Sequence, residues 1–180
     1  MYGLTNKSAD KLIRGFFSLL EEKHYSEITV TELISRSGVS RTTFYRQFED
    51  IFDMYDKICG LMIDEIMKSI VAAFENDKTG DLSVLIDVLC EKFESQKHYT
   101  RLLCGRNGDI KFFEIGVRVA FSYFSVFEKV LSEKELFTLK FVVFSGMGTY
   151  VKSILDDEIF DEKNIEIYKR ILTESQRAGG

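Results

Sequence analysis

The sequence predicts an all-helical protein, and three observations lead to that fold class. Apolar residues recur at helical spacing in the long segments between turn signals, as at Ile13, Phe16 and Leu20, which is the pattern of a helix with one buried face. The apolar–polar alternation typical of strands is not sustained between those signals. Proline, which helix interiors exclude, is absent from the 180 residues.

Short helices are expected in the first fifty residues. The first covers about residues 6–24. The second opens at Thr29, because a threonine followed three positions later by Glu32 forms a capping box. It ends near Gly38, since glycine suits the left-handed turn after a helix, and Ser40 then caps the third helix. Two short helices joined by a tight glycine turn predict a helix-turn-helix.

Longer helices are expected in the remainder of the chain. The first of them covers about residues 50–74 and ends at the turn cluster 76–80. Asp81 is expected to cap the next helix, and Asp109 to cap a long aromatic helix after the break at 105–108. A long apolar helix over about 135–156 and a last helix over about 161–175 complete eight or nine helices, in two units that divide near residue 50.

The charge pattern singles out the second and third helices. The whole chain has a net charge of −5, whereas a protein that coats nucleic acid with its entire surface is basic. The window from Leu33 to Phe48 has no acidic residue and carries Arg36, Arg41 and Arg46, a local charge of +3. Any contact with nucleic acid is therefore expected at this local patch.

The side chains around the third helix suit the major groove of DNA. Arg41 can pair bidentately with guanine, and the methyl groups of Thr42 and Thr43 can contact thymine. Tyr45 can bind a phosphate while its ring packs on the protein, and phosphate contacts of this kind set register rather than sequence. The candidate DNA-binding residues are Thr29, Thr31, Ser40, Arg41, Thr42, Thr43, Tyr45 and Arg46. The alternative is a solvated helix that happens to carry arginines.

These residues resemble those of a known family. The segments Ile28–Ile34, Ser37–Ser40 and Thr43–Phe48 resemble the DNA-binding domain of the TetR/AcrR family of transcriptional regulators, and the likeness extends over roughly residues 7–60. It implies a helix-turn-helix DNA-binding domain in residues 1–50, joined by a long helix to a ligand-sensing and dimerisation domain in 51–180.

The resemblance also implies a function. A member of this family is expected to be a homodimer that binds a palindromic operator in double-stranded DNA, with the last two long helices forming a four-helix interface. It is expected to be a ligand-responsive regulator, a repressor in most families of this design, which a small-molecule inducer releases from the operator.

One segment departs from the family pattern. Many members carry lysine soon after the position of Phe48, whereas this chain has acidic residues at Glu49, Asp50 and Asp53. Carboxylates near phosphates weaken DNA binding, although acidic residues also stabilise the start of a helix. This segment motivates an alternative hypothesis, a protein of the TetR fold with weakened DNA binding that acts through a protein partner.

Aromatic residues in the second half predict either a ligand pocket or core and dimer packing. The candidate pocket residues are Cys90, Phe93, Tyr99, Leu103, Val117 and Phe121. Gly146 and Gly148 lower helix propensity, which favours either close helix packing at a dimer interface or space for a ligand.

Other classes of protein are not expected. The sequence has no phosphate-binding glycine loop and no His-Glu-x-x-His motif, so no enzyme, cofactor or metal site is predicted. Its three cysteines fit no zinc pattern and are expected to be free thiols in the reducing cytoplasm. No apolar run is long enough to predict a membrane span.

Overall fold

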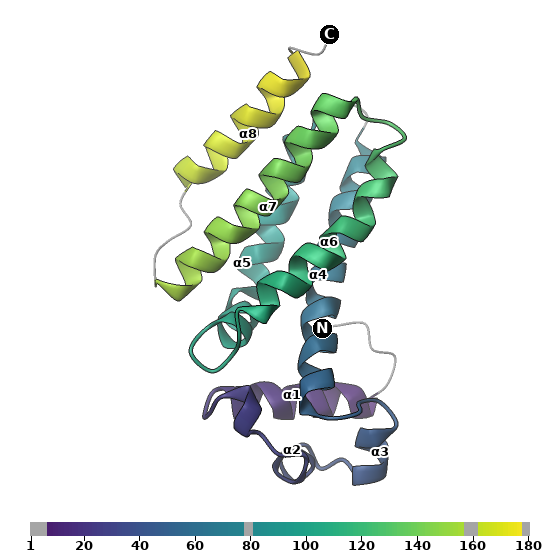
Figure 1. Cartoon of the computed structure of the whole chain (residues 1–180), viewed down its shortest axis with the longest axis vertical. Coiled ribbons are helices and arrows are strands. Elements are labelled where there is room, and N and C mark those ends of the chain that lie inside the picture. The colour runs from purple at the N-terminus through teal and green to yellow at the C-terminus, as the bar shows by residue number, and fades with distance from the viewer. Residues whose placement is uncertain (1–6, 78–80, 157–161, 178–180) are drawn as a thin grey trace.

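The computed structural model describes residues 7–77, 81–156 and 162–177. In these ranges the chain is helical and contains no β-strand, which confirms the predicted fold class (Figure 1). The elements are α1 (Lys7–Leu20), the 3₁₀ helix η1 (Tyr25–Glu27), α2 (Val30–Ser37), α3 (Arg41–Tyr45), α4 (Ile51–Asn76), α5 (Val84–Cys104), α6 (Lys111–Phe127), α7 (Glu133–Leu155) and α8 (Glu162–Arg177).

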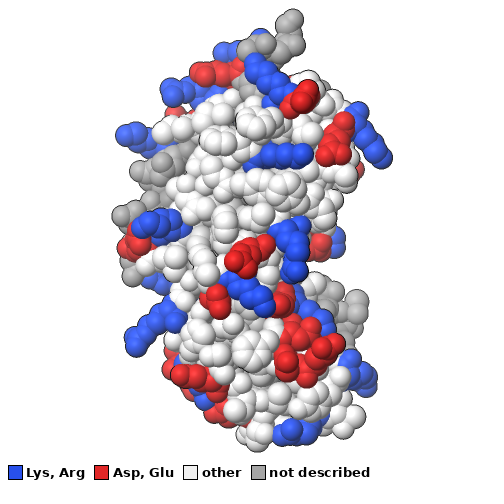
Figure 2. Space-filling view, in the orientation of Figure 1, with Lys and Arg blue, Asp and Glu red and all other residues white. Residues whose placement is uncertain are grey.

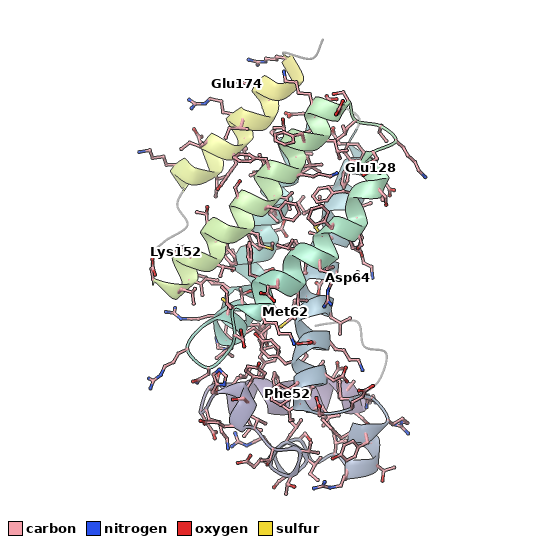
Figure 3. All side chains as sticks on the ribbon, viewed as in Figure 1. Phe52, Met62, Asp64, Glu128, Lys152 and Glu174 are labelled. Carbon is pink, nitrogen blue, oxygen red and sulfur yellow. The ribbon has the colours of Figure 1, made fainter. Side chains whose placement is uncertain are left out.

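The helices are arranged as an N-terminal unit, α1 to α3, beneath a helical body, α4 to α8 (Figure 1). The long helix α4 begins beside the N-terminal unit, where it contacts η1, and continues between α5 and α6. Helix α7 packs against α5 and α6, and α8 lies along α7. Tyr123 of α6 donates a hydrogen bond to Asp64 of α4, the residue labelled at the middle of that helix in Figure 3.

The local signals of the helix-turn-helix are confirmed. The Thr29 hydroxyl accepts from the backbone N–H of Glu32 at 3.2 Å, and the Glu32 carboxylate accepts from the backbone N–H of Thr29 at 2.9 Å. Gly38 ends α2 with φ 65° in the left-handed region. The Ser40 hydroxyl accepts from the backbone N–H of Thr43 at 3.2 Å and caps α3.

Other helix boundaries differ from the prediction. Helix α1 ends at Leu20 rather than near residue 24, and η1 follows it because the Tyr25 backbone N–H donates to the Asn107 carbonyl in the body at 2.9 Å. Asp81 and Asp109 are not the N-caps of α5 and α6. Each carboxylate instead accepts the backbone N–H two residues later, at 2.9 Å, and so closes the turn that precedes the helix.

The hydrophobic core is continuous through both units. Phe16, Leu33 and Phe44 are fully buried in the N-terminal unit, and Tyr55 continues the core into the body. Because one core runs through both units, it does not mark a division between domains, and the predicted domain boundary near residue 50 stays a prediction.

Glycines in the body show where helices approach closely. A Cβ on Gly116 of α6 would lie 2.9 Å from the Met147 sulfur of α7, so a larger residue there would displace the flexible end of the Met147 side chain. At Gly146 and Gly148 a Cβ would make ordinary contacts of 3.7 Å or longer. Packing within the chain therefore does not explain the two glycines that the sequence singled out.

Candidate nucleic-acid interface

Helix α1 supports the helix-turn-helix through close packing on α2. A Cβ on Gly15 would lie 3.2 Å from the Ser37 Cβ and 3.3 Å from the Leu33 side chain, so the two helices approach as closely as a glycine allows. The buried Phe44 ring fixes α3 to the same core. The N-terminal unit thus presents α3 on a closely packed support.

The outer side of α3 carries the predicted DNA-binding side chains together. Arg41, Thr42, Tyr45 and Arg46 are exposed, while Phe44 faces the core. The Tyr45 side chain is 51% exposed, and its ring contacts Phe44 edge-on at 5.2 Å between centroids. The arrangement leaves the Tyr45 hydroxyl accessible while the ring packs on the protein, as its predicted role requires.

Hydrogen bonds connect this surface to the start of α2. Arg41 Nη2 donates to the Thr31 hydroxyl at 2.7 Å, and the hydroxyls of Ser40 and Thr43 lie 2.9 Å apart. Thr29 and Ser40 are occupied as helix caps, and Thr43 is half-buried. The structure therefore brings the eight predicted residues into one region, where all of them except the half-buried Thr43 are exposed.

The local charge of +3 overstates the positive charge that is available to contact DNA, because one of the three arginines is paired with a carboxylate. Arg36 donates to both carboxylate oxygens of Glu22, at 2.8 and 3.1 Å, and to the Ser18 hydroxyl at 2.6 Å. The hydrogen bond from Arg36 lowers the pKa of Glu22. Glu22 precedes the acid-free window Leu33–Phe48 in the sequence, so a charge count over that window does not include it. Arg41 and Arg46 form no ion pair within the described ranges.

The acidic segment after Phe48 has a structural role. The Asp50 carboxylate caps α4 by accepting the Asp53 backbone N–H at 2.8 Å. The Asp53 carboxylate accepts from Lys57 at 2.8 Å and from the Glu49 backbone N–H at 2.9 Å. Burial raises the pKa of Asp53, but these hydrogen bonds outweigh burial and the pKa is lowered. Helix capping thus accounts for Asp50 and Asp53, and Glu49 remains exposed.

The loop between α5 and α6 fastens the N-terminal unit to the body. The Asn107 side-chain amide donates to the Leu20 carbonyl at 2.7 Å, and the Tyr25 hydroxyl donates to the Asp109 carboxylate at 3.2 Å. Sequence reasoning identified this loop only as a helix break, because a polar turn residue has no periodic pattern that reveals a distant partner. Phe52, labelled in Figure 3, lies beside Tyr25 with the ring centroids 5.5 Å apart.

The six predicted pocket residues are spread over the body. Tyr99 packs on Phe17 of α1, with ring centroids 4.6 Å apart, and Phe93 stacks on Tyr150 at 4.1 Å. Phe121 is 55% exposed on α6 and does not line the cavity that Tyr99 lines. Leu103 is fully buried, and Cys90 and Val117 are half-buried. The inducer pocket therefore stays a prediction.

The cysteine thiols are not activated as nucleophiles. The three cysteines are free thiols, and burial raises the pKa of Cys104 to about 11. A thiol with a raised pKa is a poor nucleophile at neutral pH. Within the described ranges no group of His, Cys, Asp and Glu side chains is placed to hold a metal ion, and no helix there has the length and apolar composition to cross a membrane.

Comparisons with known proteins find a likeness in structure alone. No family model matches the sequence, and no curated protein matches it. A solved structure named dihydroxyacetone kinase operon activator DhaS superposes with a TM-score of 0.62 at 13% sequence identity, over 96% of this chain and 96% of that one. At this identity the comparison shows that the two chains share a fold.

Proposed function

We propose that the protein is a transcriptional regulator of the TetR type that binds double-stranded DNA through α3. The observation that carries the proposal is the exposed side of α3, where Arg41, Thr42, Tyr45 and Arg46 lie together on a helix-turn-helix with both helices capped. Side chains at the start of a recognition helix read base edges in the major groove. The fold shared with a protein named as an operon activator supports this function.

The regulator is proposed to respond to a small-molecule ligand, most simply as a repressor that ligand binding releases from DNA. Release requires that the ligand bind one conformation more tightly than the other. The name of DhaS describes an activator, so a reporter assay must be able to detect regulation of either sign.

We further propose a homodimer, and exposed aromatic side chains indicate its surface. Phe121 on α6 is 55% exposed, and Phe137 and Phe141 on α7 are 70% and 54% exposed. Figure 2 shows a broad, mostly uncharged face over α6 and α7. Contiguous exposed apolar surface of this kind marks interaction sites, and a self-complementary patch on two copies forms a closed dimer.

The outer side of α8 is less suited to such an interface. Lys163, Glu166 and Arg170 are exposed there, and charged residues are depleted in interface cores. The resemblance implies an interface on the last two long helices, α7 and α8, which stays a prediction. From the exposed aromatic side chains we propose that α6 and α7 form it instead.

DNA binding is tested by fluorescence anisotropy on the intergenic DNA upstream of the gene and on a scrambled duplex, at several salt concentrations. The expected result is tighter binding to the upstream DNA. Arg46→Ala should weaken binding to both duplexes and reduce the salt slope by about one, since it removes one phosphate contact.

The matched control is Arg36→Ala. Because Glu22 pairs with Arg36, its loss should change the salt slope much less than the loss of Arg46. Equal and weak binding of the unmodified protein to both duplexes would contradict the proposed function. An equal effect of the two arginine variants would contradict the assignment of Arg46.

A protein partner is the second candidate function. The exposed Glu49 at the start of α4 and the pairing of Arg36 leave little free positive charge around α3, which favours weak DNA binding. This alternative predicts a stable hetero-complex in a pull-down from source cells. A specific footprint made by the protein alone would remove it.

A further inference from the structure

A cavity of about 210 Å³ lies where α1 of the N-terminal unit meets α5 of the body. Its apolar lining comes from Ile13 and Phe17 on α1 and from Tyr99 on α5. Ile13 and Phe17 are buried, and the Phe17 and Tyr99 rings are tilted by 49° with their centroids 4.6 Å apart. Two aromatic rings in contact with each other, one from each unit, therefore line the cavity.

The polar lining of this α1–α5 cavity carries two carboxylates and one guanidinium. Asp10 and Glu21 contribute carboxylates from α1, and Arg14 contributes one guanidinium. His98 of α5 also lines the cavity, and its Nε2 lies 3.5 Å from the Glu21 carboxylate. Asp10 is half-buried, whereas Arg14, Glu21 and His98 are exposed at the mouth.

We propose that the α1–α5 cavity binds a small organic ammonium ion with an aromatic body. An ammonium group is attracted to the faces of aromatic rings and forms strong hydrogen bonds with a carboxylate that is partly shielded from water. Tyr99 supplies such a ring and Asp10 such a carboxylate. The two carboxylates outnumber the guanidinium, so a cation is favoured over an anion of the same shape. The aromatic body of the ligand packs on the half-buried Tyr99 ring, which Phe17 supports.

Because the cavity lies between α1 and α5, a ligand bound there can move the N-terminal unit relative to the body. The effect of this movement on DNA binding rests on the proposed function. Helix α1 packs closely on α2 at Gly15, where a Cβ would lie 3.2 Å from the Ser37 Cβ, so a displacement of α1 is expected to carry α2 with it. A ligand that separates α1 from α5 binds one placement of the helix-turn-helix better than another and shifts the population toward it.

Calorimetric titration of the full-length protein tests the binding. The probes are 2-phenylethylammonium, neutral 2-phenylethanol and anionic phenylacetate, which share a ring and differ in charge. We expect the ammonium probe to bind at least about tenfold more tightly than the other two. Equal affinities, or preference for the anion, would overturn the proposal.

Two substitutions locate the binding. Asp10→Asn should weaken binding of the ammonium probe about tenfold, whereas Glu94→Gln, an exposed carboxylate of α5 outside the cavity, should leave it unchanged. Tyr99→Phe keeps a ring and should retain binding, while Tyr99→Leu should reduce it. Unchanged affinity in Asp10→Asn, in a protein with an unchanged melting temperature, would refute the site.

A DNA-binding measurement separates the two proposals. The ammonium probe is added to the protein–DNA complex in the anisotropy assay, and a change in DNA affinity is expected with the unmodified protein but not with Asp10→Asn. Probe binding without any change in DNA affinity would overturn the coupling. A protein that fails to bind DNA selectively yet binds the ammonium probe would refute the proposed function and leave the ligand site standing.

Discussion

Replacing Tyr55 by phenylalanine removes one buried hydroxyl from the junction between α4 and the α5–α6 loop. The Tyr55 side chain is fully buried. Its hydroxyl donates to the Leu103 carbonyl at 2.5 Å and accepts from the Asp109 backbone N–H at 3.1 Å. Phenylalanine keeps the ring that stacks on Tyr25 at 4.3 Å, so the change isolates the hydroxyl.

The backbone geometry sets the size of the effect. The Asp109 backbone N–H also donates directly to the Leu103 carbonyl at 2.8 Å. Both backbone groups therefore keep a partner when the hydroxyl is lost. The expected cost is that of one net hydrogen bond, about 1–1.5 kcal/mol of unfolding free energy, rather than the larger penalty of orphaned buried groups. For a chain of 180 residues this corresponds to a fall of about 2–6 °C in melting temperature.

Urea unfolding followed by circular dichroism measures this cost. Tyr150→Phe is a matched control, because its hydroxyl donates to the Phe93 carbonyl of α5 at 2.6 Å, inside the body. A loss above about 3 kcal/mol for Tyr55→Phe would mean that backbone groups are left unpaired, which would refute the reasoning. A loss near zero would show that the hydroxyl is not bonded as described.

Three further outcomes are expected. Gly38→Ala should lower the unfolding free energy by about 1 kcal/mol through backbone strain alone, because φ is 65° and a Cβ there meets nothing within 4 Å; a neutral result in urea unfolding would contradict this. The hydrogen bond from Lys23 lowers the pKa of Glu32 from 4.5 to about 2. The ionised Glu32 therefore stabilises the folded protein fully above the unfolded pKa, and this stabilisation is lost as the pH falls from 4.5 to about 2. Melting temperatures measured against pH should fall less steeply for Glu32→Gln. Phe141→Glu should give a monomer by light scattering, and an unchanged dimer would refute the α6–α7 interface.

Short-range signals made much of the N-terminal unit predictable. The capping box of Thr29 and Glu32, the left-handed Gly38 and the Ser40 cap each depend on atoms within a few residues of one another. Such contacts form in almost any environment once the helix begins, so their residue types suffice to predict them.

Contacts between distant segments could not be predicted in this way. Glu22 neutralises Arg36 across 14 positions, and Asn107 reaches Leu20 across 87. Phe121 was a candidate for an internal pocket and lies on an exposed side of α6. Helical periodicity identifies an apolar side of a helix, but it does not say whether a neighbouring helix, a ligand or a second copy of the chain covers that side.

The unbroken length of α4 has a geometric consequence for the proposed dimer. A helix of 26 residues is about 39 Å long, so a tilt of about 10° about its upper end moves its lower end by about 7 Å. Successive base pairs of DNA are spaced by about 3.4 Å along the axis. A tilt of this size therefore shifts α3 of one protomer by about two base pairs relative to α3 of the other. This shift is enough to put the two α3 helices out of register with the two half-sites of an operator.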